Sequence, residues 1–153
     1  MNISNEAATL DKQVRYRIYD YVMRQGLIPT LTQTSDALGW SNEETAASFQ
    51  RLADAHMLVL QKGTGEILMA NPFSAVPTPF PVKVGERLYY GNCIWDAMGI
   101  PAMLKDDGVI DASCGCCGTA MSLKVANGRL ERSEGVAHFA IPAAHWWDDI
   151  VFN

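Results

Sequence analysis

The chain of 153 residues is long enough for one domain, or for two small lobes, with a buried core. Hydrophobic residues make up 48% of it and charged residues 19%, which excludes wholesale disorder. The formal net charge of −5 argues against general affinity for nucleic acid or anionic membranes. No apolar run reaches the roughly 18 residues of a membrane span, and the N-terminus lacks the features of a signal peptide. We therefore expect a cytoplasmic protein without a membrane or nucleic-acid partner.

The first 70 residues predict three helices followed by a hairpin. An apolar stripe indicates a helix over residues 7–25, and Thr30 and Gly39 are suited to begin and end a second helix. Ser41 and Glu44 have the spacing of a capping box for a third helix. That helix is expected to bury Ala46, Phe49, Leu52 and Ala53. Two apolar runs around a glycine-containing turn complete a winged-helix-like pattern.

The charge of this lobe bears on whether it contacts DNA. Residues 1–70 contain six Lys or Arg and eight Asp or Glu, a net charge of −2, and the third helix begins with Glu43 and Glu44. Phosphate contacts dominate nonspecific affinity, and acidic residues at this position would repel them. The lobe is therefore expected to be a packing module rather than a DNA reader.

The remaining chain predicts a linker and a second lobe. Residues 71–81 contain four prolines and are predicted to be an extended linker. Residues 82–153 are β-rich, so the fold class is α+β, with a small mixed sheet and a short cysteine-bearing helix. Strands are expected over residues 81–84, 87–90, 109–113, 121–125, 129–130 and 136–141, then a short helix over residues 142–148 and the first half of a strand at 150–152.

The stretch around Cys93 carries the first candidate chemistry. Asn92 is a good N-cap, which would place Cys93 at the first helical position, where backbone N–H groups and the helix dipole favour a thiolate. Asp96 lies one helical turn further on the same face. A nucleophilic sulfur and a proton-carrying group would thus face one spot. The alternative is a buried structural cysteine beside a capping or pairing aspartate.

Three further cysteines crowd into one turn at Cys114, Cys116 and Cys117. Without an export signal, reduced thiols are expected, and clustered thiolates select soft metals. The C-x-x-C spacing of Cys114 and Cys117 is that of a zinc knuckle, but a closed zinc site needs a second pair, which the sequence lacks. The alternative is a tight turn that binds no metal.

Several of these motifs together resemble the alkylmercury lyase (organomercurial lyase) family. The resemblance rests on the run from Gly85 to Tyr90, on Cys93-x-x-Asp96, and on Pro101-Ala102, Cys114 and Gly118; the upstream run Ala37-Leu38-Gly39-Trp40 also fits the helical lobe of that family. It implies protonolysis of carbon–mercury bonds, with Cys93 as the mercury-binding thiolate and Asp96 as the proton donor. It also implies that Cys114 is structural, that no cofactor is required, and that mercury(II) remains as bound product. Small thiols would then accept the mercury, or a mercuric reductase would receive it.

The sequence departs from the family pattern in one respect. The family uses a second catalytic cysteine in a late strand, and no cysteine follows Cys117 here. The chain is a fragment, or it has lost lyase chemistry, or Cys116 or Cys117 serves as the second mercury ligand; the strand-like ending favours a fragment. Two alternatives to a lyase stay open. One is a non-catalytic soft-metal-binding protein that uses Cys93 with Cys114, Cys116 and Cys117, and the other is a metal-responsive winged-helix regulator.

Overall fold

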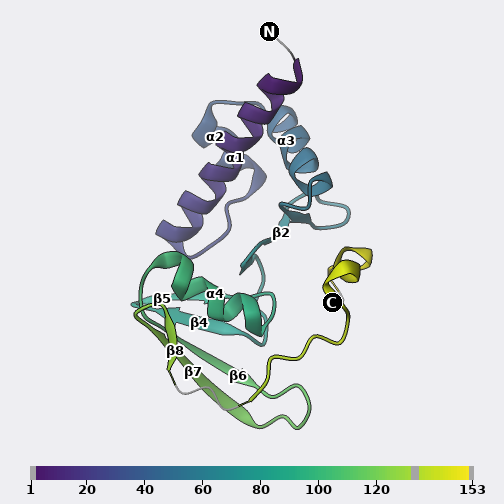
Figure 1. Cartoon of the computed structure of the whole chain (residues 1–153). Coiled ribbons are helices and arrows are strands. Elements are labelled where there is room, and N and C mark those ends of the chain that lie inside the picture. The colour runs from purple at the N-terminus through teal and green to yellow at the C-terminus, as the bar shows by residue number, and fades with distance from the viewer. Residues whose placement is uncertain (1–2, 132–134, 152–153) are drawn as a thin grey trace.

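Three helices form the N-terminal part of the computed structural model, which describes residues 3–131 and 135–151. They are α1 (Ile3–Gln25), α2 (Leu31–Leu38) and α3 (Asn42–Asp54), and Figure 1 shows them packed together above the sheets. The predicted caps are confirmed. Thr30 caps α2, Gly39 ends it in the left-handed conformation with φ 70°, and Ser41 and Glu44 form the capping box of α3.

The buried face of α3 differs from the predicted one. Ala46 is exposed, whereas the polar side chains of Thr45 and Ser48 are fully buried beside Phe49. The reason is hydrogen bonding, which is local for Thr45 and reaches α1 for Ser48. The Thr45 hydroxyl donates to the Ser41 carbonyl oxygen at 3.1 Å, and the Ser48 hydroxyl donates to the Asp11 carboxylate at 2.6 Å. Because each hydroxyl has a partner, its burial costs little, and Ser48 contacts Asp11 of α1.

A small antiparallel sheet follows the helices, in the order β1-β2-β3. Its strands are β1 (Val59–Leu60), β2 (Ile67–Ala70) and β3 (Phe73–Ser74), so the predicted hairpin is confirmed. The third strand lies within the proline-rich segment 71–81. Phe73 is buried and also pairs with Gly91 through an isolated bridge. One cluster of buried side chains continues from α1 through this sheet to the strands that follow.

The second sheet has five strands in the order β5-β4-β6-β7-β8. Its strands are β4 (Pro81–Val84), β5 (Arg87–Tyr90), β6 (Gly108–Ser113), β7 (Ala120–Ala126) and β8 (Arg129–Glu131). Every pairing among the described residues is antiparallel, so the prediction of a mixed sheet is wrong. The helix α4 (Ile94–Leu104) does connect β5 to β6, but β4 lies between these two strands, and they never become parallel neighbours.

Alternation of side chains along β6 shows which face of this sheet is covered. Gly108, Ile110 and Ala112 are buried, while the residues between them are exposed. Helix α4 packs over the buried face, against β4, β6 and β7 (Figure 1). Gly108 permits this contact, because a Cβ there would lie 2.5 Å from the Pro101 ring. The C-terminal half of α4 therefore packs close to β6.

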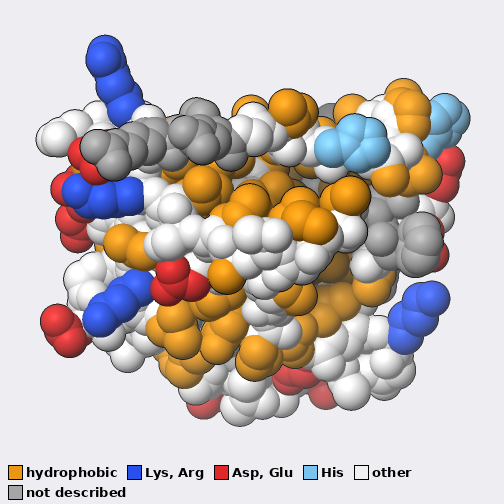
Figure 2. Space-filling model, turned by 90° about the horizontal axis from the view of Figure 1, so that it is seen from below, with side chains coloured by type: hydrophobic (Ala, Val, Ile, Leu, Met, Phe, Trp, Pro, Cys, Tyr) orange, Lys and Arg blue, Asp and Glu red, His pale blue; other side chains and the backbone are white. Residues whose placement is uncertain are grey.

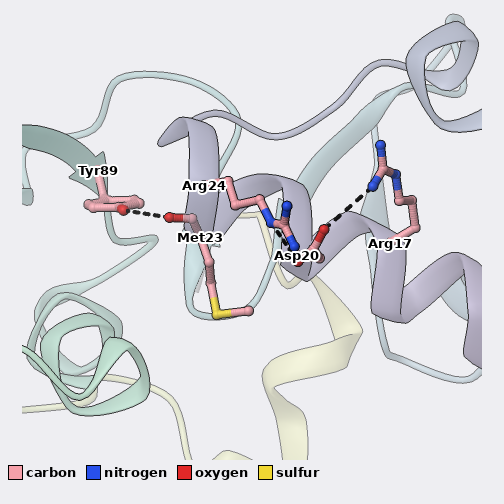
Figure 3. A network of polar contacts seen from close by, with 5 residues as sticks. All are labelled: Arg17, Asp20, Met23, Arg24 and Tyr89. Carbon is pink, nitrogen blue, oxygen red and sulfur yellow. Dashed lines mark hydrogen bonds and ion pairs between the residues drawn. The ribbon is translucent and has the colours of Figure 1, made fainter. Parts of the chain in front are cut away.

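One polar contact ties α1 to the second sheet, and others lie within α1 itself (Figure 3). The Tyr89 hydroxyl donates to the main-chain oxygen of Met23 at 3.4 Å. Near it, the Asp20 carboxylate accepts hydrogen bonds from Arg24 at 2.9 Å and from Arg17 at 3.4 Å. No helix among the described residues is long and apolar enough to span a bilayer.

The strand predicted over residues 136–141 is wrong. Residues 136–139 have no regular structure, and a 3-10 helix, η1 (Ala143–Asp148), follows (Figure 1). Aromatic contacts hold the segment instead of strand pairing, because Phe139 packs edge-on against Trp95 and Trp147 stacks on His56. The half-strand expected at 150–152 is also wrong, because residues 150 and 151 lie in a turn. Residue 152 lies outside the described residues.

Hydrophobic side chains gather on the face of the molecule that Figure 2 shows. They occupy the middle of that face, with most Lys, Arg, Asp and Glu side chains towards its edges. Among the large apolar side chains exposed in the described residues are Trp95 at 61% and Phe139 at 40%, so the aromatic contact between α4 and the C-terminal segment lies at the surface.

Candidate functional site: a thiol and a carboxyl group at the start of α4

Cys93 lies one position before the place that the sequence predicted. It is itself the N-cap of α4, with an extended backbone (φ −144°, ψ 179°), and its Sγ accepts a hydrogen bond from the backbone N–H of Asp96 at 3.5 Å. Asn92 is therefore not the cap. Its side chain faces the Asp96 carboxyl group instead, which leaves the cap position to the cysteine sulfur. The sulfur still meets an unpaired N–H of the first turn, as the predicted helix start required.

Asn92 is a site residue whose role sequence reasoning missed. Its Nδ2 donates to Asp96 Oδ2 at 3.1 Å and to Asn71 Oδ1 at 3.0 Å, so a residue from the loop after β2 helps to fix the carboxyl group. Its Oδ1 is buried and has no hydrogen-bond partner among the described residues. The contact between Asn92 and Asp96 has the i, i+4 spacing that could have signalled it.

Burial raises the pKa of both the Cys93 thiol and the Asp96 carboxyl group. Burial raises the pKa of Asp96 even though hydrogen bonds from Asn92 and Cys93 favour the carboxylate. Burial also raises the pKa of Cys93, and the neighbouring Asp96 charge adds to this, while the backbone N–H of Asp96 lowers it only in part. The effect of burial on the pKa of Cys93 therefore outweighs the stabilisation of the thiolate that was expected from the helix start. The site pairs a half-buried thiol with a carboxyl group that retains its proton to a higher pH than usual.

The other three cysteines lie at the tip of the β6–β7 hairpin. The Gly118 N–H donates to the Cys114 carbonyl oxygen at 2.8 Å, and the Cys114 N–H donates to the Thr119 carbonyl oxygen at 2.8 Å. Cys116 and Cys117 are exposed and Cys114 is half-buried. Hydrogen bonding from Thr119, whose Oγ1 is 3.1 Å from the Cys117 sulfur, lowers the pKa of Cys117. Thr119 is the second residue that sequence reasoning missed.

The two thiol regions do not merge into one metal centre. The described parts of the chain contain no group of three or more His, Cys, Asp or Glu side chains that could hold a metal ion. Cys93 begins the helix that follows β5, whereas Cys114 begins the turn that follows β6, and β4 separates these two strands in the sheet. The expectation of a soft-metal site that combines Cys93 with the three-cysteine turn is thus not met in these parts of the chain.

The order of thiol reactivity follows from these environments. We expect alkylation by iodoacetamide at pH 7 to label Cys117 faster than Cys93, because Cys117 is exposed with a lowered pKa and Cys93 is half-buried with a raised one. This reverses the order that the helix start alone predicts. Peptide mapping after short labelling times measures it, and faster labelling of Cys93 would contradict the roles assigned to burial and to Thr119.

The fold and the site define an α+β protein that presents a thiol and a carboxyl group at the start of one helix. A family model described as alkylmercury lyase matches residues 73–152, which is more than half of the chain, and the chain therefore belongs to the alkylmercury lyase family. No curated protein matches the chain.

Similarity to a solved structure supports the fold. The chain is similar to the structure titled "Crystal structure of the mercury-bound form of MerB2", with a TM-score of 0.63 and 21% sequence identity. The match covers 79% of this chain and 59% of that chain, so this chain spans about three fifths of its length. At this identity the likeness shows the α+β fold alone.

Proposed function

We propose that the chain carries out carbon–mercury bond protonolysis at Cys93 and Asp96. One observation supports this above all: the Cys93 sulfur and the Asp96 carboxyl group lie on one helical turn, and the backbone N–H of Asp96 donates a hydrogen bond of 3.5 Å to Sγ. Membership of the alkylmercury lyase family agrees with it. A soft thiolate suits mercury, and an acid beside it suits a leaving carbon.

Cys93, once deprotonated, binds the mercury of an organomercurial as a thiolate. The carbon–mercury bond then breaks, the electron pair stays on carbon, and that carbon takes the proton of the Asp96 carboxyl group to leave as a hydrocarbon. Mercury(II) remains on the Cys93 sulfur, and a small external thiolate binds it as a second ligand. The raised pKa of Asp96 serves this step, because the carboxyl group must hold a proton when mercury arrives.

Burial at the site fits the same step. The pKa of Cys93 is raised in the free protein, so its thiol proton must leave as mercury binds, and the strong sulfur–mercury bond drives that exchange. The amide of Asn92 holds the carboxyl group in place while this occurs. In this proposal no resident cofactor is needed, and bound mercury(II) passes to small thiols or to a mercuric reductase.

The organisation of the rest of the chain is also proposed. Residues 1–70 are a winged-helix-like packing lobe, residues 71–81 a connecting segment, and residues 82–153 the lobe that carries the site. Three helices followed by the β1–β2 hairpin support the first assignment. The acidic start of α3, Glu43 and Glu44, speaks against a DNA-binding role for this lobe.

Hydrocarbon release tests the proposed function. The purified chain is incubated with a phenylmercury salt and an excess of a monothiol, and benzene is measured over time against mercury bound. We expect benzene to form in proportion to enzyme and time. If the chain binds mercury but releases no benzene, it is a mercury-binding protein, and the lyase proposal is refuted.

A further inference from the structure

We infer that Cys114 and Cys117 form a two-thiol chelating site for a soft, thiophilic cation, separate from Cys93. Both residues lie in the turn that connects β6 to β7, at positions 1 and 4 of a C-x-x-C sequence. This spacing brings two sulfur atoms to the same side of a tight turn, as it does in metal knuckles. The inference does not depend on carbon–mercury cleavage, so it stands or falls separately from the proposed function.

Main-chain hydrogen bonds hold the turn in a defined conformation. Two main-chain hydrogen bonds of 2.8 Å close it, from Gly118 to Cys114 and from Cys114 to Thr119. Gly118 has a φ of 70°, which a residue with a side chain rarely adopts. A bound ion therefore need not order the loop, and little conformational entropy is lost on binding.

The side chains in the turn distinguish two of the three cysteines. Cys117 Sγ lies 3.1 Å from Thr119 Oγ1, and Cys114 begins the same turn, which is closed by the hydrogen bond from the Gly118 N–H to the Cys114 carbonyl oxygen. Cys116 lies between them, is exposed, and takes no part in these contacts among the described residues. The hydroxyl of Thr119 can stabilise a sulfur anion by donating to it. Cys114 and Cys117 are thus the natural pair, and Cys116 serves as an internal control.

The number of sulfur atoms selects the kind of cation. Zinc in structural sites takes four ligands, and the described residues offer no third or fourth His, Cys, Asp or Glu to this pair. Two thiolates satisfy soft ions that accept two ligands, such as mercury(II) or copper(I). The reaction is an exchange without oxidation or reduction: two S–H bonds and the bonds of the ion to its two earlier ligands break, two metal–sulfur bonds to the chain form, and the displaced ligands and two protons leave for solvent.

Retention of mercury tests the site in a Cys93→Ser background. The reduced variant is mixed with mercury(II) chloride and an excess of a monothiol, passed over a desalting column, and its bound mercury is measured. We expect about one mercury per chain, because a chelating pair outcompetes free monothiols by its high effective concentration. Adding Cys114→Ser or Cys117→Ser should lower retention at least roughly tenfold, because one thiolate has no such advantage. Adding Cys116→Ser, the matched control, should leave it unchanged.

Protection from alkylation gives a second measurement that needs no variant of the turn. In the Cys93→Ser chain, bound mercury should shield Cys114 and Cys117 from iodoacetamide and leave Cys116 reactive, as peptide mapping would show. Zinc(II) chloride in the same protocol should give no retention. The inference is overturned if Cys116→Ser lowers retention as much as Cys114→Ser and Cys117→Ser, if neither of those two lowers it, or if mercury shields Cys116 alone.

Discussion

Replacing Asp96 by asparagine should lower the rate of hydrocarbon release from a phenylmercury salt by at least about 100-fold, the lower range for loss of a general acid. The amide has nearly the shape of the carboxyl group, but it has no acidic proton to deliver to carbon. The backbone N–H that caps the Cys93 sulfur remains, since it belongs to the main chain of residue 96. Mercury capture should therefore change little. Benzene release and bound mercury are measured on the same samples.

The pH dependence of release provides an independent check on Asp96. Burial raises its pKa, and only the protonated carboxyl group donates a proton, so release should decline as the pH rises through that raised pKa. The carboxyl group of an exposed aspartate would lose its proton, and with it this activity, at lower pH. A release rate that does not change with pH and survives Asp96→Asn would show that solvent or another group supplies the proton.

Replacing Gly91 by alanine should have the largest effect on the fold around the site. A Cβ at Gly91 would lie 2.6 Å from the backbone nitrogen and 2.8 Å from the Cα of Ala97, in the first turns of α4. Gly91 cannot move away easily, because its N–H donates to Phe80 at 3.0 Å and its carbonyl oxygen accepts from Thr78 at 2.6 Å. We expect a loss of about 1–3 kcal/mol in the free energy of unfolding, as for other overpacked cores.

Gly99 provides the matched control within the same helix. A Cβ at Gly99 would meet only Pro72, at 3.9 Å, which is an ordinary contact. Gly99→Ala should therefore stabilise the chain by about 0.4–1 kcal/mol through the unfolded state. Denaturant titrations of both variants measure the difference. Equal stabilities would contradict the close approach of α4 to the end of β5, on which the position of Cys93 depends.

Much of the fold is encoded in short-range signals that a reader of the sequence can interpret. The caps Thr30, Ser41 and Gly39 bound two helices because each satisfies backbone groups within one turn. The strands predicted over residues 81–84 and 87–90 pair with each other, and so do those predicted over residues 121–125 and 129–130. Local hydrogen bonding needs no knowledge of the tertiary structure.

The errors arise where long-range packing decides the outcome. The burial that raises the pKa of Cys93 comes from the packing around the start of α4, and no local pattern reports it. The contact of Asn71 with Asn92 joins residues 21 positions apart. The segment at 136–141 has the apolar content of a strand, but aromatic contacts with Trp95 and His56 hold it and the residues after it, and no strand within residues 3–131 or 135–151 pairs with it. The structure of this segment depends on contacts with residues far away in the sequence, which a local pattern does not reveal.

A chain with Cys93 as its single cysteine tests the central claim most directly. Cys114, Cys116 and Cys117 are all replaced by serine, and benzene release from a phenylmercury salt is measured with excess monothiol, beside the Cys93→Ser chain that retains the other three cysteines. We predict release by the first protein at close to the unmodified rate and none by the second, because the sulfur next to Asp96 is the one that presents mercury to its proton. Release that persists in the Cys93→Ser chain and disappears from the Cys93-only chain would contradict this account and place the chemistry in the three-cysteine turn.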